Sequence, residues 1–140
     1  MTSSHIILQK PWSLFLLISC QQGLFYLYLM YIKQRIDLLI ANSVLYCSSV
    51  LFWSSPSYGF RRNLDRLVVK LHTFYVNYCA LTELREYSTY AGFVLLYLNG
   101  FMFYVLGCQF YKRQLYTIYT LTHIVLHTCG GFATYLLIRN

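Results

Sequence analysis

The sequence predicts an all-α protein, a single bundle of five transmembrane helices that occupies residues 1–140. Three observations lead to this prediction. Apolar residues make up 58% of the chain and charged residues only 11%, whereas roughly 25% of an ordinary soluble domain is charged. The apolar residues form runs long enough to cross a bilayer. The basic residues cluster in the gaps between those runs, as anchors at lipid headgroups do.

The first two predicted helices are well delimited. A helix needs roughly 20 residues to cross about 30 Å of hydrocarbon, and residues 12–32 supply this length. Residues 36–53 form the second run, and the loop at 33–35 is so short that the two helices must be antiparallel neighbours. A hinge at residues 54–63, which contains Pro and Gly, then ends the second helix.

The third predicted helix, residues 67–81, is the shortest and most polar of the five. It contains Lys70, His72 and Asn77, whose exposure to lipid would be costly. It can span the membrane only if these side chains face neighbouring helices or reach the headgroups. The alternative is a bundle of four crossings, with this segment lying at the membrane interface.

The last two predicted helices are residues 89–110 and 115–138, again joined by a short loop. Small residues let helix backbones approach each other closely inside a membrane. Glycines along the fourth helix therefore predict a groove for another helix, and two more glycines lie in the fifth. These predicted helix-packing positions are Gly92, Gly100, Gly107, Gly130 and Gly131.

The net charge of +7 is distributed over the loops. A nucleic-acid-binding protein would gather it on one face or tail, so we expect no nucleic acid as partner. With five crossings, seven basic residues lie on one membrane side and four on the other, which favours an N-terminus on the cytoplasmic or matrix side. The residues expected to anchor the bundle at the membrane interface are Arg61, Arg62, Arg66, Lys112 and Arg113.

Several polar residues are predicted to face the bundle interior. His123 and His127 are four residues apart on the last helix and share one face. Asp65 and His72 share a face of the third helix, and Ser49 lies on the second. A rise of about 1.5 Å per residue places these groups at depths that allow one shared pocket. They either bond to one another and hold helices together or form a chemical site.

The segment from Ser48 to Arg66 has a distinctive order of residues. A Ser-rich helix end is followed by Phe52-Trp53, then by Pro and basic residues, and then by Asp65. This order resembles a signature of small uncharacterised multi-pass membrane proteins of protists, algae, fungi and large viruses. The resemblance covers about a fifth of the chain and implies a membrane bundle without assigning an activity.

More distantly, Ser49, Asp65 and the His123-x-x-x-His127 pair resemble the membrane hydrolase superfamily of alkaline ceramidases, progestin and adiponectin receptors and haemolysin III-like proteins. The resemblance implies a zinc-dependent lipid amidase. Catalytic zinc normally has three protein ligands, which here would be His72, His123 and His127. Asp65 would orient a ligand or move a proton, and Ser49 would complete the catalytic set.

A shorter resemblance concerns the segment from His127 to Gly131. It is similar to the haem-ligating His-x-x-x-Gly segment of succinate dehydrogenase membrane anchors. This implies a haem b or quinone held by His72 and His127. The basic and His residues that follow this segment in those anchors are replaced here by Phe132, Ala133 and Thr134.

The predicted function is that of a non-catalytic membrane subunit that packs within a larger membrane complex, such as a mitochondrial respiratory or ATP synthase assembly. Little chain lies outside the predicted helices, and Trp53 stands where the hydrolase superfamily has its third zinc-binding histidine. We expect membrane lipids and other membrane protein subunits as partners, no cofactor, and a location in the mitochondrial inner membrane, with the endoplasmic reticulum as alternative. The zinc-dependent lipid hydrolase and the haem- or quinone-binding anchor stay open as alternative functions.

Overall fold

The computed structural model describes residues 7–140, and all regular elements within this range are helices. In chain order they are α1 (Trp12–Cys20), α2 (Gln22–Ile32), α3 (Ile36–Ser54), α4 (Phe60–Glu83), α5 (Tyr87–Lys112) and α6 (Tyr116–Arg139). The all-α prediction is confirmed. Four of the five predicted helices have ends within two residues of the observed ones, whereas α4 begins seven residues earlier than predicted.

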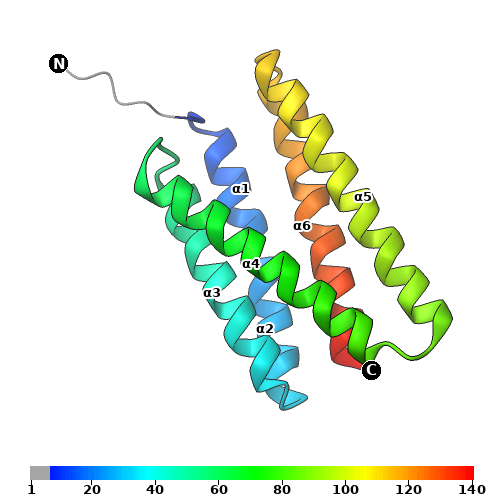
Figure 1. Cartoon of the computed structure of the whole chain (residues 1–140). Helices are drawn as coiled ribbons and strands as arrows, with labels where there is room; N and C mark the ends of the chain where they lie inside the picture. Colours follow the sequence, from blue (N-terminus) through cyan, green and yellow to red (C-terminus); the bar gives the residue numbers. More distant parts are fainter. Residues whose placement is uncertain (1–6) are drawn as a thin grey trace.

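The first predicted helix consists of α1 and α2, which follow each other along one axis (Figure 1). At the joint, the Gln21 amide donates to the carbonyl of Ile18 at 3.0 Å, and the Leu24 amide donates to that of Gln21 at 3.1 Å. These bonds reach three residues back, so the backbone tightens locally without changing direction. The two segments together form one candidate span, Trp12–Ile32.

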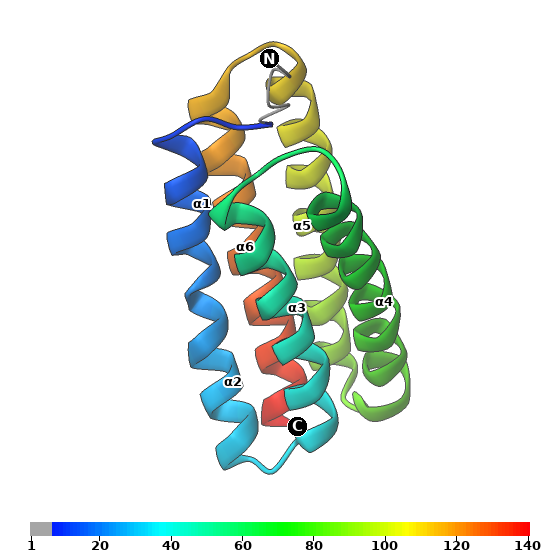
Figure 2. The same ribbon diagram turned by 90° about the vertical axis from the view of Figure 1, so that its left-hand side faces the viewer.

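The helices form an elongated bundle in which α6 has a central position (Figures 1 and 2). It contacts α5 along its length and also packs against α1, α2 and α4. Helix α3 packs on α1, α2 and α4. We call the end that holds the α3–α4 and α5–α6 connections the basic end, because seven of the eleven Lys and Arg residues lie toward it. The other is called the opposite end.

Helix α4 completes a fifth passage through the bundle. It falls outside the four helices that are long and apolar enough to span a membrane, since it carries Arg61, Arg62, Arg66 and Lys70. However, α3 and α5 both run from the opposite end to the basic end (Figures 1 and 2). The chain between them must therefore return from the basic end to the opposite end. Helix α4 makes this return, antiparallel to α3. The five-helix topology follows from this direction of travel.

The two short interhelical turns have the same backbone geometry. In the first, the Arg35 amide donates to the Met30 carbonyl at 2.9 Å, and in the second the Leu115 amide donates to the Phe110 carbonyl at 3.0 Å. Each turn places a glutamine in the left-handed region, Gln34 with φ 56° and Gln114 with φ 60°. This is a helix C-cap that usually takes Gly, and it reverses the chain within three residues.

Exposed apolar surface identifies the class of protein. In the four apolar helices only 17–28% of the residues in the span windows are buried. Large apolar side chains point outward, among them Phe25, Leu98 and Phe101. Two buried clusters form the interior. The larger one has members on every helix from α2 through α6, and the smaller one joins α1 to α3. A water-soluble monomer does not expose apolar surface on this scale, so the chain is a multi-pass membrane protein in contact with lipid.

Candidate functional site

His127 lies near the centre of α6 and is bound to α1. Its Nδ1 atom is 2.8 Å from the Ser19 hydroxyl oxygen. The Ser19 hydroxyl donates its own proton to the carbonyl of Leu16, also at 2.8 Å. The imidazole must therefore donate in the bond to Ser19, which assigns the proton to Nδ1 and leaves Nε2 as an acceptor. The bond holds the ring between α1 and α6.

His123, one turn earlier on α6, lies in an aromatic cluster. Its ring centroid is 4.9 Å from that of His127, 5.2 Å from that of Trp53 and 5.6 Å from that of Tyr119. The contacts with Trp53 and His127 are edge-to-face, and Trp53 is buried. The indole therefore fills the space between His123 and α3. One turn earlier, Thr120 is buried, and its hydroxyl has no hydrogen-bond partner among residues 7–140.

Asp65 faces α3 from the first turns of α4. Its Oδ1 atom accepts hydrogen bonds from the Ser49 hydroxyl at 2.8 Å and from the Ser48 hydroxyl at 3.3 Å. The structure therefore brings together the predicted Ser49 and Asp65. The Ser49 hydroxyl is the main donor that stabilises the half-buried carboxylate, because the single Ser48 proton is shared with the Leu45 carbonyl at 3.0 Å. Both contacts join α3 to α4, and they keep the carboxylate away from lipid, where it would be costly.

His72 also faces α3 and bonds to a different residue. Its Nε2 atom is 3.1 Å from the Oδ1 atom of Asn42, whose amide group donates to the carbonyl of Leu38 at 2.9 Å. The Asn42 oxygen is the acceptor, so His72 donates from Nε2. Asn77, further along α4, bonds to the carbonyl of Thr73 at 2.8 Å. Of the three polar residues named for the third span, His72 meets the condition of facing a neighbouring helix because it turns toward α3, whereas Lys70 is exposed and Asn77 bonds within its own helix.

A polar cluster at the opposite end joins three helices through Arg35. Its Nε and Nη2 atoms donate to the two oxygens of Asp37 at 3.2 and 3.1 Å, and Nη2 lies 2.9 Å from Oε2 of Glu83. Nη1 donates to the carbonyl of Leu137 on α6 at 3.1 Å. The hydrogen bond to Asp37 raises the pKa of Arg35 above its usual value. One guanidinium thus connects the turn before α3 to the ends of α4 and α6.

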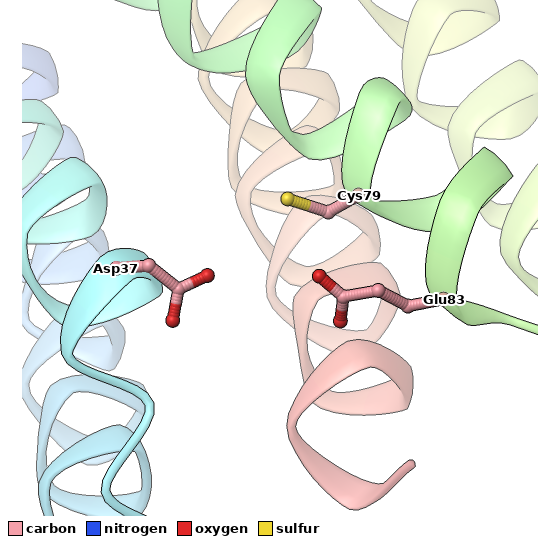
Figure 3. Close-up of side chains that lie close together, drawn as sticks. All are labelled: Asp37, Cys79 and Glu83. Atoms are coloured by element: carbon pink, nitrogen blue, oxygen red, sulfur yellow. The ribbon is translucent and has the colours of Figure 1, made fainter.

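The same cluster contains three side chains of the types that bind metal ions. The ligand atoms of Asp37, Cys79 and Glu83 lie within 4.8 Å of one another, and Figure 3 shows them turned toward one another from α3 and α4. Arg35, however, bonds to both carboxylates. The guanidinium of Arg35 supplies the positive charge that a metal cation would otherwise supply to these carboxylates. The arrangement therefore fits an ion-paired connection between helices better than a metal centre.

The three histidines implied as zinc ligands are divided between two places. His72 pairs with Asn42 on α3, whereas His123 and His127 stack on each other on α6. No group of three potential ligands that includes them has atoms within 4.8 Å in the described part of the chain. The same separation applies to His72 and His127 as a haem pair. These cofactor assignments stay predictions that the observed side-chain positions do not favour.

Two open grooves lie at the surface of the bundle. An open groove of about 350 Å³ lies between α3 and α4 and is almost entirely apolar. A second groove of about 340 Å³ lies beside Trp12 and the start of α6. Neither is lined by His123, His127 or Asp65.

The glycines of α5 pack within the chain itself. A Cβ atom at Gly100 would lie 3.4 Å from Leu126, and one at Gly107 would lie 3.0 Å from Thr122, both on α6. Gly92 similarly faces Leu136, at 3.6 Å. The helix that these residues admit is α6, so they do not form a groove for another protein.

The two glycines of α6 differ in their surroundings. At Gly131 a Cβ atom would overlap the ring of Tyr26, whereas Gly130 is exposed and faces open space.

Among the predicted basic anchors, Arg62 is half-buried, with its guanidinium 4.7 Å from the ring centroid of Tyr58. The remaining predicted anchors are exposed at the basic end: Arg61, Arg66, Lys112 and Arg113.

The Arg35 cluster was missed by the sequence reasoning, although a signal for it was present. Of the four acidic residues, Asp37, Glu83 and Glu86 all lie where the five-helix topology places the opposite end. Acidic residues grouped on one membrane side with a single arginine between two helices indicate an ion pair. A count of the basic residues alone does not reveal this grouping of acidic residues.

Comparison with known proteins gives no relative for this chain: no protein-family model, curated protein or solved structure matches it. The fold and site therefore define a class only, that of small multi-pass helical membrane proteins with interior polar side chains that bond to one another and to backbone carbonyls. The resemblances to the membrane hydrolases and to haem-binding anchors stay hypotheses.

Proposed function

We propose that this chain is a non-catalytic subunit of a larger membrane protein complex, with an assembly of the mitochondrial inner membrane as the preferred host. Two features support the proposal. The interior residues that could perform chemistry have partners within the chain: His127 bonds to Ser19, Asp65 to Ser49 and His72 to Asn42, while His123 packs against aromatic rings. In addition, the described connections between helices are short, which leaves little chain for a substrate domain.

The observation that carries the proposal is Asn99 on the outer face of α5. It lies in the middle of Tyr87–Lys112 and is exposed, in a region where lipid would otherwise surround it. Its amide donates to the carbonyl of Leu95 at 2.8 Å, but its Oδ1 atom accepts no hydrogen bond from residues 7–140. Each unsatisfied polar group in hydrocarbon costs several kcal/mol, and Asn side chains join membrane helices by hydrogen bonding across them.

The occupant we assign to this face is a transmembrane helix of another subunit. Leu95, Leu98 and Met102 are exposed beside Asn99 and supply the apolar contacts for such a helix. In this arrangement Asn99 accepts a hydrogen bond from the partner helix. The glycines of α5 lie on the side that packs against α6 and are not part of this surface.

The test is native extraction of the protein and of an Asn99→Leu variant in mild detergent, followed by mass spectrometry of co-purifying subunits and elemental analysis. We expect a fixed set of partners with the natural chain, loss of that set with Asn99→Leu, and retention with the control Leu121→Met on the exposed side of α6. A stable monomer, a pure homodimer, or about one zinc per chain without partners would overturn the proposal.

A further inference from the structure

Lys70 lies on the side of α4 that faces away from α3. Asp65 and His72 bond to α3, and at about 100° per residue Lys70 is about 140° from the first and about 160° from the second. Its side chain is exposed, and Figures 1 and 2 show α4 at the outside of the bundle. Lys70 forms no salt bridge or hydrogen bond within residues 7–140. Its ammonium group therefore has no partner in the described part of the chain.

The level of Lys70 in the bilayer follows from the pairing of α4 with α3. From Asp65 to His72 the chain advances seven residues along α4, and the α3 residues bonded to these two lie seven residues apart in the reverse direction. The helices thus run antiparallel in one register, and Lys70 is level with Val44, near the centre of Ile36–Ser54. At about 1.5 Å per residue this level is about 12–15 Å from either end of α3. The four-carbon stem of a lysine cannot reach the headgroups over this distance.

Exposed apolar side chains form a stripe on the same side of α4. They follow one another at alternating intervals of four and three residues and are 55–77% exposed: Leu67, Leu71, Phe74, Tyr78 and Leu81. This alternation averages 3.5 residues, which is the repeat of a seam that packs along a second helix. Lys70 borders the stripe, three residues after Leu67 and four before Phe74. We call the stripe together with Lys70 the Lys70 face.

Neither a lipid phosphate nor a second copy of this chain can supply the counter-charge for Lys70. A charged side chain at the bilayer centre is costly unless it is paired, and lipid phosphates lie at the headgroups, beyond its reach. Of the four acidic residues of the chain, Asp65 bonds to α3. The other three lie toward the opposite end: Asp37, Glu83 and Glu86. A second copy would have its carboxylates at the same depths, so none of them would be free at the level of Lys70.

We propose that the Lys70 face binds a transmembrane helix of another subunit, and that this helix carries an Asp or Glu at the level of Lys70. The carboxylate forms an ion pair with the Lys70 ammonium, which removes both charges from contact with hydrocarbon. Apolar side chains of the same helix pack along the stripe. This assignment rests on the proposed function, and it specifies the chemistry of one partner, on a different helix from Asn99.

The experiment is native extraction in mild detergent, with the amount of each co-purifying subunit per chain measured by mass spectrometry. The test variant is Lys70→Met, which removes the charge and keeps a flexible, unbranched side chain. Lys33→Met is the matched control, because Lys33 is exposed in the turn between α2 and α3. Lys70→Arg keeps the charge at the test position. Far-UV circular dichroism verifies that the three variants keep their helix content.

We expect the recovery of one subunit to fall about 100-fold with Lys70→Met, because its carboxylate would be left unpaired at the bilayer centre. Lys33→Met and Lys70→Arg should retain that subunit. Its sequence should contain an Asp or Glu near the middle of a transmembrane helix. Replacing this residue with Asn or Gln should reduce the recovery to the same extent as Lys70→Met does.

Three results would overturn this assignment and leave the proposed function in place. They are retention of every subunit with Lys70→Met, an equal loss with Lys33→Met or Lys70→Arg, and a lost subunit without a carboxylate inside the membrane. A natural chain extracted without any partner would instead overturn the proposed function, and this assignment with it.

Discussion

Replacing Arg35 with Met is predicted to destabilise the bundle by about 2–3 kcal/mol. Breaking a fully buried ion pair costs about 3–5 kcal/mol because one charge is left without a partner, whereas an exposed pair contributes about 0–1 kcal/mol. The Arg35 side chain is 23% exposed, and the carboxylates of Asp37 and Glu83 are 43% and 35% exposed. The loss should therefore lie between these limits. It includes the bond from Arg35 to the Leu137 carbonyl.

The assay is equilibrium unfolding in mixed micelles with increasing dodecyl sulfate, followed by far-UV circular dichroism. Arg85→Met is the matched control, because Arg85 is an exposed arginine close to the same end and forms no salt bridge within residues 7–140. It should change the free energy of unfolding by less than about 0.5 kcal/mol. A double-mutant cycle between Arg35→Met and Glu83→Gln should give a coupling energy of about 1 kcal/mol.

The reasoning is refuted if Arg35→Met and Arg85→Met have the same free energy of unfolding within error. Such a result would mean that solvent screens the Arg35 cluster as completely as an ordinary surface pair. The ends of α3, α4 and α6 would then be held together by apolar packing and by the bonds from Tyr75 to Asp37 and from Asn140 to the Glu83 carbonyl.

Three further predictions use the same unfolding assay. Gly130→Ala should stabilise the bundle by up to about 1 kcal/mol, since the added Cβ meets open space. Gly131→Ala should destabilise it by about 1–3 kcal/mol, because the added Cβ overlaps with Tyr26. Changes of the same sign in the two variants would contradict this packing. Gln34→Gly should stabilise the left-handed turn at φ 56° by about 1 kcal/mol, and a loss of stability would refute that geometry. Hydrogen bonds from two hydroxyls at the start of α5 lower the pKa of Glu86. Its stabilising effect is therefore present above the unfolded pKa of about 4.3 and lost as pH falls through the lower folded pKa. Glu86→Gln should flatten stability against pH in that window, and an unchanged pH profile would be the contrary result.

Part of the candidate site could be predicted from helical periodicity. His123 and His127 share a face because they are four residues apart on one helix, and their rings do stack. The rise per residue along their helices placed Ser49 and Asp65 at similar depths, and the two side chains are in fact hydrogen-bonded. The partner of His72 could not be predicted in this way, because it depends on how α4 is rotated against α3. That rotation turns His72 toward Asn42.

The role of the α5 glycines shows a similar limit. Their spacing indicates a surface that another helix can approach closely, but it contains no information on which helix that is. In the structure Gly100 and Gly107 face α6 of the same chain. The surface left for a partner is the one marked by Asn99, whose significance depends on which side of α5 is exposed.

The sequence by itself determined that the chain is a multi-pass helical membrane protein, and it placed most helix ends within two residues. It could do so because crossing hydrocarbon requires a minimum apolar length, and because charged residues between those runs stay at the headgroups. Only the tertiary structure decided that α4 makes a fifth passage, since hydropathy does not record that α3 and α5 run in the same direction. The pairing of Arg35 with Glu83 likewise depends on contacts between residues far apart in the sequence.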